Sequence, residues 1–308
     1  MTTRPLCIHH DKCPDGFTAA WAVARHFKGE VDHLAANYGH PVPSGIDGRD
    51  VIIVDFSWPQ EQLEEIARRA RTLVVLDHHK SAEASLAEFG ETVSSGDGLA
   101  LWQRMRDGGE PARPLKIFDM DRSGARLAWD FLGMKGPGER LVNYVQDRDL
   151  WTWRLPRSRE INALVCGTPF TMENWDMLSM RMDNEPFMLA DLGGAILMNQ
   201  EKILADTLPE VTRRMVIGGY EVPVANLPHF MASDAAHILD RGEPFAAVYY
   251  DRRDGRKFSL RSSGEEGSAD VSAIAALYGG GGHRNAASFV APLGWEGEPA
   301  PEADDPRP

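Results

Sequence analysis

The chain has 308 residues, of which 43% are hydrophobic and 26% are charged, a globular composition at a length that favours two domains. Its formal net charge of −13 argues against a long nucleic-acid duplex as partner, because such binding depends on Lys and Arg side chains. No apolar stretch reaches bilayer length, no signal-peptide pattern opens the chain, and the three cysteines are too scattered for a disulfide framework. We therefore expect a cytoplasmic protein that binds no membrane.

The N-terminal part alternates short apolar runs with helix-like segments, which predicts repeated βα units around a mostly parallel sheet. Ligands of such sheets bind at the carboxyl ends of the strands. The predicted strands and the helices that follow them are 6–9 with 14–27, 51–55 with 59–71, and 72–77 with 81–89. A further strand is expected at 115–118, followed by a helix that opens at Ser123-Gly124 and another that runs towards Asp147.

Residues 195–215 carry apolar side chains at helical spacing and predict a connecting helix between two differently patterned regions. Beyond it we expect a strand at 215–226, a helix at 233–239, two strands around the Asp254-Gly255 turn and a helix at 269–277. The fold class is therefore α/β, with a parallel-sheet domain and a smaller C-terminal α/β domain. We place these domains at 1–190 and 216–292, the linker helix at 191–215, and a disordered tail rich in Pro, Glu and Asp at 293–308.

Potential metal ligands follow each of the first three predicted strands. They are His9, His10 and Asp15 after the first, Asp55 after the second, and Asp77, His78 and His79 after the third. A helix cap or a satisfied polar side chain explains any single position equally well, but three converging strand ends favour a shared site. Carboxylates and imidazoles suit Mn²⁺, Fe²⁺, Co²⁺ or Zn²⁺, and a carboxylate between two ions makes a site that activates water.

These residues resemble the Asp-His-His (DHH) phosphoesterases, a family that includes single-strand exonucleases, nano-RNases, cyclic-dinucleotide phosphodiesterases and family II inorganic pyrophosphatases. The resemblance rests on Asp77-His78-His79 at the end of an apolar strand, on Asp55 after Val-Ile-Ile-Val, and on Asp15-Gly16 at the first helix. It implies that Asp55 bridges two metals, that His78 binds metal and that His79 contacts substrate phosphate. Asp77 would anchor the histidines from behind.

A fourth motif of the family supplies another aspartate, and residues 144–151 are its counterpart here. We favour Asp147 as the ligand, with Asp149 as the alternative. The cofactor implied is one or two divalent ions, Mn²⁺ first, with Mg²⁺ or Co²⁺ as alternatives.

The first motif departs from the family pattern, because Cys13 stands where an aspartate is usual and His9 where the histidine is usual. The missing ligand is replaced by Cys13, supplied by His10 or Asp11, or absent. This version of the motif resembles the nano-RNase B type branch, in which His10 replaces His9 as the ligand.

A second block of resemblance covers residues 258–262 and 279–287 and is similar to the DHH-associated C-terminal domain. A glycine run exposes backbone N–H groups to a phosphate, and neighbouring basic side chains add directed donors. A flexible turn is the alternative explanation for the glycines alone. The predicted substrate-binding residues are Arg261, Gly280, Gly281, Gly282, His283 and Arg284.

Two further groups of residues carry weaker signals. Trp151, Trp153 and Phe170 would suit stacking of a nucleotide base, although buried aromatic side chains are the commoner case. Arg122 or Ser123 would suit phosphate contact, although a helix N-cap is the simpler role for Ser123.

The resemblance implies a metal-dependent 3′-5′ exonuclease or oligoribonuclease that hydrolyses short single-stranded RNA or DNA, or dinucleotides, with metal-activated water. The alternatives are a cyclic nucleotide or cyclic dinucleotide phosphodiesterase, and a nucleotide sensor that has lost one metal through Cys13. A pyrophosphatase is disfavoured by the glycine-His-Arg block. A homodimer is left open.

Overall fold

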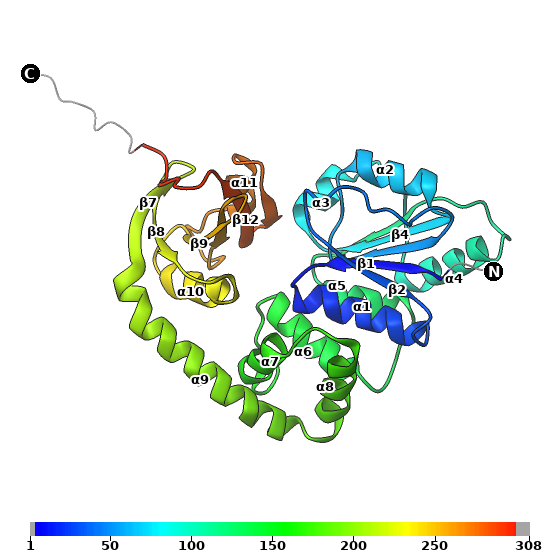
Figure 1. Cartoon of the computed structure of the whole chain (residues 1–308), viewed down its shortest axis with the longest axis horizontal. Helices are drawn as coiled ribbons and strands as arrows, with labels where there is room; N and C mark the ends of the chain where they lie inside the picture. Colours follow the sequence, from blue (N-terminus) through cyan, green and yellow to red (C-terminus); the bar gives the residue numbers. More distant parts are fainter. Residues whose placement is uncertain (1–3, 300–308) are drawn as a thin grey trace, which may run out of the picture. The chain divides into compact units, whose positions relative to one another are not determined.

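A computed structural model describes residues 4–299 of the chain (Figure 1). It divides into two compact units, with the boundary between Met198 and Asn199. Each unit has its own sheet and its own hydrophobic cores. The predicted fold class, an N-terminal parallel-sheet domain followed by a smaller α/β domain, is confirmed.

The first unit is built on a six-stranded sheet in the order β2-β1-β3-β4-β6-β5. Every neighbouring pair is parallel. Because β1, β3 and β4 are adjacent, their carboxyl ends lie side by side. The strands are β1 (Leu6–His10), β2 (Asp32–Ala36), β3 (Asp50–Val54), β4 (Thr72–Asp77), β5 (Glu91–Thr92) and β6 (Leu115–Phe118).

Helices cover both faces of this sheet, because its central strands are apolar on both sides. Along β3, Ile52 and Val54 belong to the core that includes α1 and α5, whereas Val51 and Ile53 belong to the core that includes α2. Figure 1 shows α1 and α5 on one side of the sheet and α2 on the other. The helices are α1 (Pro14–His26), α2 (Gln60–Arg69), α3 (Lys80–Ser85), α4 (Ser95–Arg106), α5 (Gly124–Phe131), α6 (Glu139–Asp149), α7 (Ser158–Gly167) and α8 (Met172–Asn184).

The long helix α9 (Pro186–Val211) occupies most of the expected linker region. It begins earlier than the predicted 191–215 and ends sooner, because the chain enters a strand at Thr212. Leu204 and Leu208, in the last turns of the helix, are buried in a core of the second unit. No helix within residues 4–299 is long and apolar enough to cross a membrane.

The second unit contains a sheet in the order β11-β12-β10-β9-β8-β7, antiparallel except for the β8–β9 pair. The predicted strand at 215–226 is a hairpin instead, because Gly218 and Gly219 take positive φ and turn the chain. Its elements are β7 (Thr212–Ile217), β8 (Tyr220–Asn226), a 3₁₀ turn (His229–Met231), α10 (Ala232–Leu239), β9 (Ala246–Arg252), β10 (Gly255–Arg261), α11 (Val271–Ala276), β11 (Gly281–His283) and β12 (Ala286–Ala291).

The predicted disordered tail was wrong for residues 293–299. Trp295 packs against Phe258 and Phe289, with ring centroids 5.1 and 5.8 Å apart. Glu298 pairs with Val216 in a β-bridge and accepts a hydrogen bond from the Gly219 N–H at 2.9 Å. An apolar side chain and a backbone partner thus order a segment of polar composition. The remainder of the predicted tail, 300–308, lies outside the described residues.

Candidate metal centre

The carboxyl ends of β1, β3 and β4 carry the predicted ligands. Asp55 follows β3 in the left-handed region, with φ of 63°, a conformation that a short polar side chain tolerates better than most. Asp55 is 1% exposed, and its two oxygens face different partners. Strained backbone of this kind is common at functional sites.

One oxygen of Asp55 faces a group formed by His78, Asp15 and Asp149. The Nε2 atom of His78 lies 3.0 Å from Asp55 Oδ1. The same nitrogen lies 3.8 Å from Asp15 Oδ2 and 3.5 Å from Asp149 Oδ2. The donor atoms of Asp15, His78 and Asp149 all lie within 4.8 Å of one another.

The other oxygen of Asp55 faces His10 and Cys13. Asp55 Oδ2 lies 3.5 Å from His10 Nδ1, which is too long for a good hydrogen bond. The donor atoms of His10, Cys13 and Asp55 again lie within 4.8 Å of one another. Asp55 is therefore shared by two groups of potential ligands.

Both groups fit a divalent cation. Two ligand atoms that each bind one ion at about 2.0–2.3 Å lie at most about 4.6 Å apart, so small side-chain adjustments suffice. The atoms Asp55 Oδ2 and His10 Nδ1 are buried and have no hydrogen-bond partner among the described residues. Buried polar atoms of this kind are costly without a partner, and a cation would satisfy both.

Asp77 lies behind the ligands and orients the histidines. Its Oδ1 accepts hydrogen bonds from the backbone N–H of His78 at 2.7 Å and from His79 Nδ1 at 2.7 Å. Its Oδ2 accepts one from Ser57 Oγ at 2.5 Å. Ser57 was not among the predicted site residues. Its position, two residues after Asp55, could have identified it as a neighbour of the site.

The start of α5 holds Asp15 in place. The backbone N–H groups of Gly124 and Ala125 donate to the two oxygens of Asp15 at 2.6 and 3.1 Å. A side chain at Gly124 would lie 2.5 Å from Asp55 Cβ, so this approach requires glycine. The opening of this helix at Ser123-Gly124 was predicted, but its role at the site was not.

The charges of the cluster are mutually dependent. Burial alone disfavours the charged form of His78, but the carboxylates of Asp149, Asp55 and Asp15 raise its pKa to about 10. Burial, followed by the charges of Asp149 and Asp55, raises the pKa of Asp15 well above its usual value. Burial alone would raise the pKa of Asp55, but the imidazoles of His10 and His78 hold it well below its usual value.

Asp147, the favoured ligand, lies in none of the donor groups of the described residues, because its carboxylate makes other contacts. Asp147 accepts hydrogen bonds from Thr152 Oγ1 at 2.6 Å and from the backbone N–H groups of Arg154 and Leu155 at 2.8 and 3.1 Å. Two residues on a helix differ by about 200° in direction, so Asp149 faces the cluster when Asp147 faces the following loop.

His10, and not His9, joins the donor groups of the described residues. Neighbouring residues of a strand point to opposite faces of the sheet. The ring of His9 packs edge-on against Phe17, with centroids 5.7 Å apart, and its Nδ1 lies 3.1 Å from the carbonyl oxygen of His10. Asp11 lies near Asn37 instead, with 3.4 Å between Oδ2 and Nδ2.

The residues that carried weaker sequence signals lie in different environments in the structure. Phe170 packs on Phe17 in the core, with ring centroids 5.4 Å apart, which does not suit base stacking. Trp151 and Trp153 lie edge to face on the half-buried loop after α6, with centroids 4.9 Å apart. Ser123 is the N-cap of α5, where its hydroxyl accepts from Arg126 N. Arg122 pairs with Asp119 and Asp130.

The predicted substrate-binding residues lie in the second unit, where the glycine run forms the edge strand β11. Ala286 of β12 pairs with Arg261 of β10 on one side and with His283 of β11 on the other. Residues directly opposite on neighbouring strands point to the same face, so Arg261 and His283 share a face about 10 Å apart. Gly281 and Gly282 pair with β12. A side chain at Gly280 would lie 2.2 Å from the Ser288 carbonyl oxygen. Arg284 is exposed in the turn between β11 and β12.

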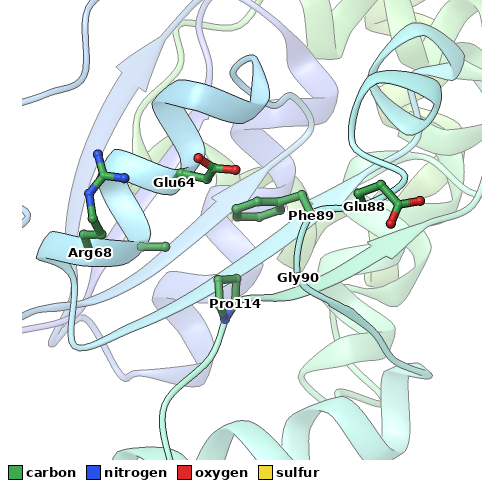
Figure 2. Close-up of a pocket in the computed structure, with 7 residues that line it drawn as sticks. Glu64, Arg68, Glu88, Phe89, Gly90 and Pro114 are labelled. Carbon is green, nitrogen blue, oxygen red and sulfur yellow. The ribbon is translucent and has the colours of Figure 1, made fainter.

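A shallow pocket of the first unit lies away from this centre (Figure 2). Gly90 and Pro114 come directly before β5 and β6, so the pocket lies at the amino ends of these strands, opposite to the metal ligands. Its other lining residues are Glu64, Ala67, Arg68, Glu88 and Phe89.

No family model matches the chain. An uncharacterized protein of Acanthamoeba polyphaga mimivirus, R106, is 26% identical over 312 residues, which cover 92% of this chain and 67% of that protein. Among solved structures, the DHH domain of a member of the s1p family of ribosomal proteins shares 14% identity at a TM-score of 0.54, covering 94% of this chain and 83% of that chain. RecJ from Thermus thermophilus in complex with Mn²⁺ shares 16% identity at a TM-score of 0.51, and the match covers 94% of this chain and 49% of the RecJ chain. The chain therefore shares the fold of this DHH domain and of the matched part of the RecJ chain.

Proposed function

We propose that this chain is a DHH-type, metal-dependent phosphodiesterase that hydrolyses short oligonucleotides or dinucleotides. The observation that carries this proposal is the position of Asp55, whose two buried oxygens face two separate groups of potential metal ligands. Paired divalent ions around a shared carboxylate would stabilise charge on a phosphate and lower the pKa of water. The fold shared with a RecJ structure that contains Mn²⁺ supports Mn²⁺ as the first ion to test.

The protein's own residues would hold the reacting groups in position. Asp15 is fixed by two backbone donors of α5, so its carboxylate loses little freedom when it binds an ion. Asp77 fixes the ring of His79, which would donate to a non-bridging phosphate oxygen. In the second unit, Arg261 and His283 would hold a terminal phosphate, because they share a face beside the glycine strand.

The net charge of the chain favours a short substrate. A net charge of −13 gives no general attraction for long polyanions, so binding would depend on a few directed contacts to phosphate.

The test is a time course with Mn²⁺ on a 5′-labelled RNA pentamer, beside a linear and a cyclic dinucleotide. We expect stepwise shortening of the pentamer, lost in Asp55→Ala and retained in the neighbouring Asp11→Asn variant, whose side chain lies outside both donor groups. Cleavage of a dinucleotide alone would restrict the role to that substrate. Binding without cleavage of any substrate would contradict the enzyme and favour a nucleotide sensor.

A further inference from the structure

The two groups of ligands around Asp55 differ in their chemistry. Asp15, Asp149 and His78 offer carboxylate oxygens and an imidazole nitrogen. The group on the other side combines the nitrogen of His10, the sulfur of Cys13 and a carboxylate oxygen of Asp55. Only this second group contains a thiol.

The position of Cys13 in the fold leaves its sulfur available to bind a metal ion. Cys13 is the N-cap residue of α1, with an extended backbone at φ of −114° and ψ of 123°, but its side chain makes no capping hydrogen bond. It forms no disulfide and is half-buried. Serine, threonine and aspartate are the usual residues at an N-cap, so capping does not explain a cysteine here.

Independent support comes from the atoms around the sulfur. Asp55 Oδ2 and His10 Nδ1 are both buried without a hydrogen-bond partner among the described residues, and Asp55 is 1% exposed. His10, Cys13 and Asp55 each offer one ligand atom that lies within 4.8 Å of the other two, and these atoms form three corners of a cation site. A fourth ligand would come from solvent or substrate, as in other catalytic sites with three protein ligands.

We infer that Cys13 is a metal ligand and that it makes the His10–Cys13–Asp55 position prefer a thiophilic divalent ion such as Zn²⁺ or Co²⁺. Thiolates favour such ions, whereas carboxylates with one imidazole accept the harder Mn²⁺ or Mg²⁺. The Asp15–His78–Asp149 position would therefore take the harder ion. This inference rests on the proposed metal-dependent function and adds that the two positions bind different metals.

The test is a Co²⁺ titration of the metal-free full-length protein, followed by absorption spectroscopy. A thiolate ligand gives a charge-transfer band in the near ultraviolet, whereas the visible bands of Co²⁺ appear with any ligand set. We expect the near-ultraviolet band in the wild type, its loss in Cys13→Ser and Cys13→Asp, and its retention in the control Cys166→Ser. Circular dichroism of each variant checks the fold. Cys13→Asp keeps a potential metal ligand at residue 13, so loss of the band in this variant reports the loss of the sulfur alone.

Competition with Mn²⁺ tests the difference between the positions. Excess Mn²⁺ should weaken the visible bands of the wild type but spare the near-ultraviolet band, whereas in Cys13→Asp it should displace all Co²⁺. Visible bands without a near-ultraviolet band in the wild type would overturn the inference and leave the phosphodiesterase proposal standing. No Co²⁺ binding at all, by absorption or by calorimetry, would overturn both.

Discussion

Asp77 belongs to neither group of potential metal ligands. Its carboxylate nevertheless accepts four hydrogen bonds. It is completely buried and accepts hydrogen bonds from Ser57, from two backbone N–H groups and from His79 Nδ1. Charged acceptors of this kind form strong hydrogen bonds, and they fix the orientation of an imidazole ring. Asp77 therefore acts through His79.

We predict that Asp77→Asn lowers kcat by roughly 10–100-fold while the affinity for metal changes much less, because an amide cannot accept all four donors. Steady-state kinetics on the RNA pentamer and calorimetric titration with Mn²⁺ measure the two effects. Ser57→Ala is the matched control and should cost less, since it removes only one donor. An Asp77→Asn enzyme with wild-type kcat would show that His79 needs no such support.

At the level of elements, the end of α6 carries two aspartates with different tasks. Asp149 faces His78, whereas Asp147 binds the loop 150–155 through three hydrogen bonds. In that loop Trp151 and Trp153 have positive φ values of 55° and 51°, which large side chains rarely adopt. The hydrogen bonds to Asp147 stabilise this unfavourable backbone.

We predict different effects for the two aspartates. Asp147→Ala should lower the free energy of unfolding by about 2 kcal/mol, because it removes the charged acceptor of three part-buried hydrogen bonds. Asp149→Ala should weaken Mn²⁺ binding, because it removes a proposed ligand, and should change the metal-free stability less than Asp147→Ala, because its repulsion of Asp15 and Asp55 offsets its attraction to His78. Denaturant unfolding and calorimetric titration of both variants separate these effects, and equal losses of metal affinity would contradict the assignment.

The elements differ in how far the sequence predicts them. The strands β1, β3 and β4 are apolar runs that end in ligands, and their order follows from βα connectivity, so the shared site was predictable. The strand β2 is half-exposed, with Asp32 and His33 in it, and it shows no strand pattern. The choice between Asp147 and Asp149 depends on the rotation of α6 about its axis, which packing determines and the motif does not.

If the proposed function holds, protons and metal ions compete for the cluster around His78 in the folded protein. The folded metal-free protein keeps a proton on His78, because the surrounding carboxylates raise its pKa to about 10. The unfolded chain releases the histidine proton near its ordinary pKa of about 6.5. Between these two values the folded state binds more protons, so its stability falls as pH rises.

We predict that the free energy of unfolding of the metal-free protein decreases with pH above about 6.5, by on the order of 1 kcal/mol per pH unit. The protein loaded with Mn²⁺ should lack this slope, because the ion takes the place of the proton. Thermal unfolding in a chelator and in Mn²⁺, over the lower part of this pH window, measures the difference. Identical slopes would show that the ion does not bind at His78.

The second unit should matter in proportion to the length of the substrate. We predict that Arg261→Ala raises KM for the RNA pentamer and affects bis-p-nitrophenyl phosphate much less, because that small diester has no terminal phosphate to hold. Arg253→Ala, in the exposed turn between β9 and β10, is the matched control and should change neither value. Equal losses on both substrates would remove Arg261 from the phosphate contact.

Gly124 brings the start of α5 so close to Asp55 that even a methyl group would lie 2.5 Å from the Asp55 Cβ atom. In a library of random variants selected only for activity, this position should therefore be as intolerant of change as the ligands themselves. A glycine without any reactive group would then score as an essential residue, because it determines how near the helix can approach. Such a profile would reflect backbone geometry, and it should persist when the assay is changed from turnover to metal binding.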